Sequence, residues 1–217
     1  MTLYFNPEKH TYTIGNSPNS LLSVTSVLPD IPDFLLCKQA FIEKTLLGSR
    51  VHECCDTINL FYKENKGVIP NKDYYQGNST QDADIPYINA YKQFLVDRHP
   101  VIQVSEFRTY HRKLMYAGTI DLVAWIDGKL WIIDLKTSAQ IAPYAKLQLA
   151  AYLRMWNEQA DKQFRTFRRA VVHLLPNGEY KFIPYTVSSL GDDFDIFMCK
   201  LRSAQWDQEN LGQYTYQ

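Results

Sequence analysis

The chain has 217 residues, 46% of them hydrophobic and 14% aromatic, and its 23 basic and 23 acidic residues give no net charge. This length is enough for one domain with a sizeable core, and the composition is that of an ordinary globular protein. No hydrophobic run approaches the length of a membrane span, and residues 1–7 resemble neither a signal peptide nor a transit peptide. Because a neutral chain has no general attraction to nucleic acid, any surface that binds it must be a local basic patch.

Two groups of basic residues are candidates for such a patch. Charges solvated on loops and helix surfaces are the alternative, and that alternative holds for most members of both groups. The first group is Arg108, His111, Arg112 and Lys113, and the second is Lys162, Arg165, Arg168 and Arg169.

The expected elements comprise helices at both ends and three consecutive strands in the middle of the chain. Apolar residues at helical spacing indicate the helices, and runs of β-branched and aromatic residues indicate the strands. Residues 66–84 are polar and rich in Gly, Asn and Asp, which predicts a mobile loop. In chain order we expect a weakly alternating stretch over 3–14, a turn over 16–19, helices over 35–47 (ended by Gly48), 49–64 and 85–96, strands over 101–110, 116–126 and 129–136, a helix after Pro143 that ends near 158, a hairpin of strands 170–175 and 179–187 across Asn177-Gly178, and a helix over 192–206.

The two central strands flank Asp127-Gly128, the strongest short-range signal for a hairpin. A two-residue turn there sets Asp121 opposite Asp134, with Lys136 two residues further along the same face. Facing like charges about 5 Å apart destabilise a sheet, so the two carboxylates require a cation between them. A three-residue or bulged turn would shift this pairing by one residue.

These charged residues stand in strands that are otherwise apolar on both faces, as expected of a sheet covered by helices on each side. Charges in such strands are costly unless they are paired, bound to a metal or near an opening. A buried Asp–Lys ion pair is the alternative to a metal site. Oxygen ligands without a cysteine cluster suit Mg²⁺ or Mn²⁺ better than zinc. Carboxylates that hold such an ion beside a lysine are what phosphodiester hydrolysis requires.

Four motifs follow one another in the chain: Gly48 to His52, Gly118–Asp121, Asp134–Lys136 and Gln148–Tyr152. This series resembles the RecB-like branch of the PD-(D/E)xK nuclease superfamily, which has a histidine on an early helix, Gly-x-x-Asp and Asp-x-Lys on two strands, and Gln-x-x-x-Tyr on the next helix. Ile120 replaces the usual proline before the first aspartate. Residues 22–28 are similar to the entry segment of the mitochondrial and phage-encoded exonucleases of this branch.

The resemblance implies an α/β fold with an αβββαβ restriction-endonuclease-like core, in which helices flank a mixed central sheet. An additional hairpin and helix would follow at the C-terminal end. It also implies a single nuclease domain over 1–217, with an N-terminal extension over 1–47, a core over 48–187, and a C-terminal helix and tail over 188–217.

The resemblance further implies roles for individual residues. Lys136, Asp121 and Asp134 would be catalytic, and a metal would be held by the two aspartates, His52 and the backbone carbonyl of Leu135. Gln148 and Tyr152 would position Lys136 or the DNA backbone. The ordinary alternatives are a satisfied histidine at a helix interface and the polar edge of an amphipathic helix.

Further candidates come from the residues themselves. Thr137 and Ser138 could offer hydroxyls to a phosphate or merely end the strand. Glu106 could be an additional acid near the metal or an ion-pair partner for Arg108. Weaker candidates for contact with DNA are Arg112 and Lys113.

The implied activity is that of a Mg²⁺- or Mn²⁺-dependent deoxyribonuclease. It would act from the ends of DNA, preferably single-stranded, in recombination, repair or phage DNA processing. A single-strand-binding or recombination protein is the kind of protein partner such a nuclease would meet. The single-strand preference depends on residues 21–47, which either arch over the site or only cap the core. A structure-specific endonuclease, a duplex exonuclease and a non-catalytic nucleic-acid-binding subunit remain alternatives.

The cysteines argue against an iron–sulfur cluster of the kind found in some RecB-like nucleases. Of Cys37, Cys54, Cys55 and Cys199, only the last follows the nuclease core, so a clamp of three C-terminal cysteines cannot form. Their uneven spacing does not suggest a disulfide framework either. We expect reduced, mostly buried thiols in a cytoplasmic protein of a bacterium or a phage-infected cell.

Overall fold

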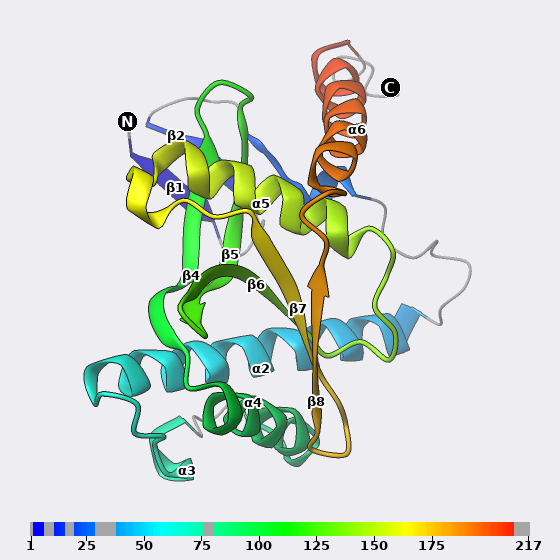
Figure 1. Ribbon diagram of the computed structural model, residues 1–217. Helices are drawn as coiled ribbons and strands as arrows, with labels where there is room; N and C mark the ends of the chain where they lie inside the picture. Colours follow the sequence, from blue (N-terminus) through cyan, green and yellow to red (C-terminus); the bar gives the residue numbers. More distant parts are fainter. Residues whose placement is uncertain (1, 7–10, 16–19, 29–37, 76–79, 211–217) are drawn as a thin grey trace.

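The computed structural model describes all residues except 1, 7–10, 16–19, 29–37, 76–79 and 211–217. In the described residues a mixed sheet lies between two layers of helices (Figure 1). No helix among them is both long and apolar enough to span a membrane. The elements are β1 (Leu3–Asn6), β2 (Thr11–Ile14), β3 (Leu22–Ser23), α1 (Val24–Val27), α2 (Lys38–Glu64), α3 (Lys72–Tyr75), η2 (Asp82–Asp84), α4 (Ile85–Arg98), β4 (Val101–His111), β5 (Tyr116–Ile126), β6 (Lys129–Lys136), α5 (Ala145–Gln159), η3 (Lys162–Phe164), β7 (Arg168–Leu174), β8 (Tyr180–Tyr185) and α6 (Leu190–Asn210).

The central sheet has the order β3-β5-β6-β7-β8, and β4 pairs with the opposite edge of β5. The neighbours β4, β5 and β6 are antiparallel, whereas β6 and β7 are parallel. A parallel pair requires a crossover connection, and α5 provides it between β6 and β7. The series α2, β4, β5, β6, α5, β7 is therefore the predicted αβββαβ core, and the predicted fold class is confirmed. The small α4 insertion lies between α2 and β4.

The turn at Asp127-Gly128 has the predicted register. Ile126 pairs with Lys129, and the β5–β6 ladder continues from there to the pair Leu122–Ile133. The two turn residues have φ angles of +51° and +68°. Both values lie in the left-handed region that a two-residue hairpin turn requires, which is why Asp-Gly predicts this turn well.

Each face of the sheet has its own hydrophobic core, because its strands carry apolar residues on both sides. Helices α2 and α4 cover one face, where Val51, Ile58 and Tyr91 pack on the sheet. Helices α5 and α6 cover the other face, where Leu149 and Phe197 pack in the same way. Full burial of each such side chain contributes about 1.5–3 kcal/mol. The site described below lies between these two layers.

Two sequence predictions in this region were wrong. Gly48 does not end a helix, because α2 continues through it to Glu64. Glycine inside a helix costs about 1 kcal/mol, which the burial of Val51 and Ile58 on the same helix exceeds. The predicted loop over 66–84 contains α3 and η2. The predicted turn over 16–19 and the predicted helix start at 35–37 lie outside the described residues.

A charged clamp, formed by Arg50 and Asp84, explains why η2 has a fixed structure where a loop was predicted. Both carboxylate oxygens of the buried Asp84 accept hydrogen bonds from the guanidinium of Arg50 on α2, at 2.7 and 2.8 Å. Bidentate pairs of this kind are among the stronger hydrogen bonds in proteins. The clamp holds η2, and with it the start of α4, against the helix that carries His52.

Candidate active site

The two predicted aspartates lie where β5 and β6 separate. The ladder between these strands ends at Leu122–Ile133, and Asp121 and Asp134 come directly after it. Beyond this point β6 continues beside β7. Asp121 Oδ2 accepts a 2.7 Å hydrogen bond from the backbone N–H of Leu135. Both aspartates are buried, with 7% and 1% of their surfaces exposed, so their charges are largely removed from water.

Glu106 on β4 lies level with Asp121, because the β4–β5 pairs on either side of it are in register. Its φ of +45° is rare for a residue other than glycine and costs about 1–3 kcal/mol. On β5, Ile120 and Leu122 pack in different core layers although they are two residues apart. The regular alternation of side chains therefore shifts at Asp121. These irregularities bring Glu106 and Asp121 to the same side chain, that of His52.

His52 reaches this point from α2. Its Nδ1 is 3.4 Å from Glu106 Oε1 and 3.7 Å from Asp121 Oδ2, and its Nε2 is 3.1 Å from the carbonyl oxygen of Leu135. One ligand atom from each of the three side chains lies within 4.8 Å of the others. Burial lowers the pKa of His52, but the carboxylates of Asp121 and Glu106 outweigh it and raise the pKa to about 9. The arrangement therefore attracts positive charge.

Lys136 connects the aspartates to α5. Its Nζ lies 2.9 Å from Asp134 Oδ2 and donates a 3.1 Å hydrogen bond to Gln148 Oε1. The Nε2 of Gln148 in turn donates to the hydroxyl of Tyr152 at 3.1 Å. Burial lowers the pKa of Lys136, but Asp134 and Asp121 outweigh it, so that the pKa lies above its ordinary value. Lys136 is thus a cation held in one orientation.

The donor atoms of this cluster suit a divalent cation. Burial raises the pKa of Asp134 to about 6, and, apart from the ion pair just described, neither of its oxygens has a hydrogen-bond partner among the described residues. Buried oxygens without hydrogen bonds are costly unless a cation satisfies them. Carboxylates and a carbonyl are oxygen ligands of the kind that Mg²⁺ and Mn²⁺ take, and an imidazole nitrogen beside them favours Mn²⁺ of the two. The groups that would hold the metal are the side chains of His52, Glu106, Asp121 and Asp134 and the carbonyl of Leu135.

The hydroxyl residues after Lys136 lie at the end of β6. Ser138 donates a 2.8 Å hydrogen bond from its hydroxyl to the Gln140 carbonyl, and its own carbonyl is 2.7 Å from His173 Nε2. These contacts fit the alternative in which Ser138 ends the strand. Thr137 lies against α2, where a Cβ at Gly48 would be 3.4 Å from Thr137 Oγ1.

Several basic candidates lie further from the cluster than Arg108, which follows Glu106 by two residues on β4. Arg112 and Lys113 belong to the β4–β5 turn, beyond the last ladder pair, which includes Tyr116. Tyr116 precedes Asp121 by five residues of strand, or about 17 Å. Arg169 is fully buried in an ion pair with Asp193 and cannot belong to a surface patch.

Sequence reasoning gave no role to Asp56 and no reason for Gly118. Asp56 follows His52 by one helical turn, and its Oδ1 is buried without a hydrogen-bond partner in the described part of the chain. The spacing of one helical turn from His52 was the sequence signal that could have identified Asp56.

A Cβ at Gly118 would lie 2.8 Å from Cε1 of Tyr152, so the glycine makes room for this ring. Only the packing of α5 on β5 reveals that requirement.

Comparisons with known proteins agree with this geometry. A sequence model of the PD-(D/E)XK nuclease superfamily matches residues 42–208. Mitochondrial genome maintenance exonuclease 1 of Mus musculus is 29% identical over 111 residues, which are 48% of this chain and 32% of the mouse protein. The chain therefore matches about a third of the length of that relative.

Two solved structures are similar only at a low level. The crystal structure of SSO0001 has a TM-score of 0.31 and 16% identity, covering 73% of this chain and 86% of its own. The alkaline exonuclease LHK-Exo from Laribacter hongkongensis has a TM-score of 0.31 and 8% identity, covering 88% and 91%. The assignment therefore depends on the sequence match, which spans most of the chain and every motif residue from His52 to Tyr152. The chain belongs to the PD-(D/E)XK nuclease superfamily.

Proposed function

We propose that this chain is a Mg²⁺- or Mn²⁺-dependent deoxyribonuclease that hydrolyses phosphodiester bonds from the ends of single-stranded DNA. The observation that carries the proposal is the cluster at the separation of β5 and β6. There, a lysine fixed on Asp134 stands beside carboxylates and an imidazole that converge on one point. We extend to this chain a role in DNA repair, recombination or phage DNA processing, and the cytoplasmic location stays a prediction.

The contacts of the cluster residues suggest two separate roles, metal binding and stabilisation of phosphate charge. His52, Glu106, Asp121 and Asp134 would hold the metal, which when bound would supply a water of lowered pKa and neutralise phosphate charge. Lys136 would donate a hydrogen bond to a phosphate oxygen or to the attacking water and stabilise the negative charge on the non-bridging oxygens of the pentacoordinate transition state.

Two residues of α5 would position that lysine. Gln148 holds Lys136 Nζ by a 3.1 Å hydrogen bond, and Tyr152 orients the amide of Gln148 from behind. Neither residue needs to touch the substrate for this role. Loss of either should therefore slow hydrolysis more than it weakens DNA binding.

The depth of the site supports a single-stranded substrate. Asp121 and Asp134 expose less than a tenth of their surfaces, so a phosphate must enter a recess to reach them. Duplex DNA is stiff, with a persistence length of about 50 nm, so bending it into a recess costs free energy that a flexible single strand does not require. The mouse relative is named as an exonuclease, which supports action from ends. The segment 21–47, for which an arch over the site and a mere cap on the core were the alternatives, lies partly outside the described residues, at 29–37.

The test compares linear and circular DNA, single- and double-stranded, with Mg²⁺, Mn²⁺ or EDTA. We expect degradation of linear single strands that requires metal. Lys136→Ala should lower the rate by about two to four orders of magnitude, as does loss of one acid–base or electrostatic group elsewhere. Lys129→Ala is the matched control, since Lys129 is exposed at the start of the same strand.

Four results would contradict the proposal. Near wild-type hydrolysis by Lys136→Ala, or hydrolysis in EDTA, would place the chemistry elsewhere. Equal rates on circular single strands would indicate an endonuclease, and equal rates on blunt duplex would indicate a duplex exonuclease.

A further inference from the structure

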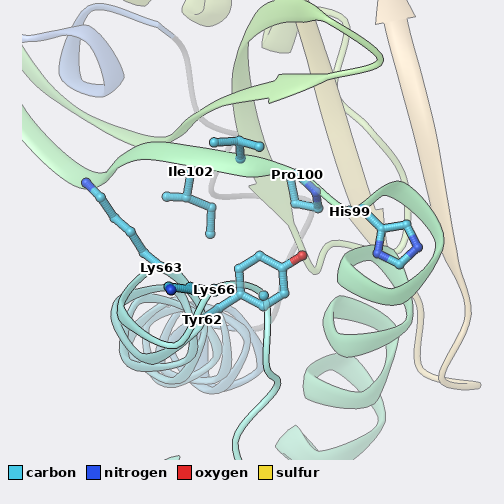
Figure 2. Close-up of a pocket in the computed structure, with 8 residues that line it drawn as sticks. Tyr62, Lys63, Lys66, His99, Pro100 and Ile102 are labelled. Atoms are coloured by element: carbon cyan, nitrogen blue, oxygen red, sulfur yellow. The ribbon is translucent and has the colours of Figure 1, made fainter.

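A groove runs between the C-terminal half of α2 and the first half of β4. The part nearest the cluster has a volume of about 330 Å³ and is lined on the β4 side by residues 102–108. The adjoining part has a volume of about 400 Å³ and ends at Lys66 and His99 (Figure 2). Both parts are lined by Lys63 and Ile102, so they adjoin at these two residues.

One end of this groove borders the candidate active site at Glu106. Glu106, which faces His52, is among the lining residues. The other end lies near Val101, five residues earlier on β4, or about 17 Å away along the strand. A polymer bound at the cluster can therefore continue directly into the groove.

The backbone of β4 is irregular where the groove passes it. The register with β5 shifts between Ile102 and Val104, which leaves Gln103 as an extra residue. The Nζ of Lys63 reaches across from α2 and donates a 2.6 Å hydrogen bond to the exposed carbonyl side of this bulge, at Gln103 O. Figure 2 shows Lys63 extending from α2 toward the strand. A bulge bends its strand, and here it lies where the two parts of the groove meet.

Apart from Glu106 at the cluster, the charged residues that line the groove are basic. Lys63, Lys66 and Arg108 line it and are exposed, and Glu106 at the cluster is the one acid among the lining residues. None of the three cations forms an ion pair with a carboxylate in the described part of the chain. Lys63 uses one of its three N–H donors on Gln103. Cations without a carboxylate partner, in a row that leads away from a nuclease site, complement a chain of phosphates.

Apolar surface accompanies these cations. Leu60 on α2 and Val101 on β4 expose 53% and 62% of their surfaces at the groove. We propose that the groove binds the single strand of DNA next to the scissile phosphate, with phosphates on Lys63 and Lys66 and bases against Leu60 and Val101. Proteins hold single strands without sequence preference by a basic groove that follows the phosphates and by side chains, usually aromatic, that contact the bases; here aliphatic side chains would make the second kind of contact. The proposal rests on the proposed function for the identity of the strand.

Salt dependence of DNA binding tests the groove. The probe is a fluorescein-labelled oligothymidylate of about 20 nucleotides, long enough for the cluster and the groove together. Anisotropy is measured in EDTA from low to moderate salt, so that binding is read without hydrolysis. The double variant Lys63→Gln/Lys66→Gln should bind severalfold more weakly at low salt. Its slope of log affinity against log salt should be shallower by about 1.4, since each phosphate contact to a single strand contributes about 0.7.

A matched variant controls for the loss of two charges. Lys129→Gln/Lys181→Gln removes two exposed lysines from β6 and β8, which lie outside the groove lining, and should leave the slope unchanged. Lys63→Arg/Lys66→Arg should restore the wild-type slope, which a folding defect would not allow. An unchanged slope in the glutamine variant, or the same decrease in the control, would overturn the proposal that the groove binds the DNA strand.

The result of the salt-dependence experiment can be distinguished from the result of the hydrolysis experiment that tests the proposed function. If the wild type hydrolyses DNA through Lys136 but the slope is unchanged, the groove alone is wrong. If the slope decreases as expected but the protein hydrolyses no DNA, the proposed function alone is wrong. Because the anisotropy measurement needs no metal, each result is readable without the other.

Discussion

Gly118→Ala should disturb the candidate active site through Tyr152 on α5. The added Cβ would lie 2.8 Å from Cε1 of Tyr152 and 3.4 Å from side-chain atoms of Met155 and Val24. Real Cβ atoms essentially never approach another atom closer than 3.0 Å, so the buried ring of Tyr152 must move. Its hydroxyl would then shift relative to Gln148, which holds Lys136.

The expected cost follows from the packing. Forcing extra volume into a well-packed core destabilises by about 1–3 kcal/mol. For a domain of this size, each kcal/mol lowers the melting temperature by about 2–4 °C, so the decrease should be about 2–12 °C. Hydrolysis should fall by about 10- to 100-fold, since a displacement of about 1 Å in a catalytic group has effects of that size. The affinity for Mn²⁺ should change little, because no ligand is touched.

Thermal unfolding, calorimetric titration with Mn²⁺ and single-turnover hydrolysis measure these three quantities. Gly191→Ala is the control, since Gly191 has no atom within 4 Å of an added Cβ. In Gly118→Ala/Tyr152→Leu the clash is relieved, so the double variant should lose less stability than the sum of its single changes. Wild-type melting and hydrolysis by Gly118→Ala, together with additive effects in the double variant, would refute this reasoning.

Three further outcomes follow from the site and its supports. Asp134→Asn should weaken Mn²⁺ binding by at least about 10- to 100-fold in a calorimetric titration, the loss seen when a group one shell further out is removed. Metal affinity should increase as the pH rises through about 6, where the Asp134 carboxyl loses its proton, and further toward about 9, where His52 becomes neutral. Titrations in buffers of different ionisation enthalpy should therefore detect proton release on binding, and a pH-independent affinity would contradict the ligand set. Asp84→Ala breaks the buried pair with the partly exposed Arg50 and should destabilise by an amount near the lower end of about 3–5 kcal/mol in denaturant unfolding. Since the pKa of Asp84 is lowered, that contribution is present at neutral pH and is lost as the pH falls through the folded-state pKa.

Local chemistry explains which predictions from the sequence were confirmed. The turn at Asp127-Gly128 needs two residues that tolerate a positive φ, and the alternation of the flanking strands leaves one register. Helical stripes such as that of Val51 and Ile58 identify α2 because their spacing follows the helix period. The roles of Gln148 and Lys136 came from a motif, and the structure brings the two side chains together at 3.1 Å.

Other features depend on residues that are distant in sequence. Gly48 was predicted to end a helix because glycine is a poor helix former, yet burial along α2 outweighs that local preference. Arg169 was assigned to a surface patch because arginine is usually exposed, yet Asp193 on a later helix pairs with it in the interior. Neither the burial along α2 nor the pairing of Arg169 with Asp193 can be identified from a local sequence pattern.

The sequence by itself determined the order of the elements and the hairpin register, because both depend on the conformational preferences of neighbouring residues. The set of motif residues came from the resemblance of the sequence to the nuclease superfamily. Only the tertiary structure decided that β5 and β6 separate just beyond Leu122–Ile133, that Glu106 turns toward His52, and that a groove continues from there along α2. These features arise where β5 stays paired with β4 while β6 leaves β5 and continues beside β7, and where α2 packs over this region. Which strands pair at that point depends on packing over the whole domain, which no short stretch of sequence encodes.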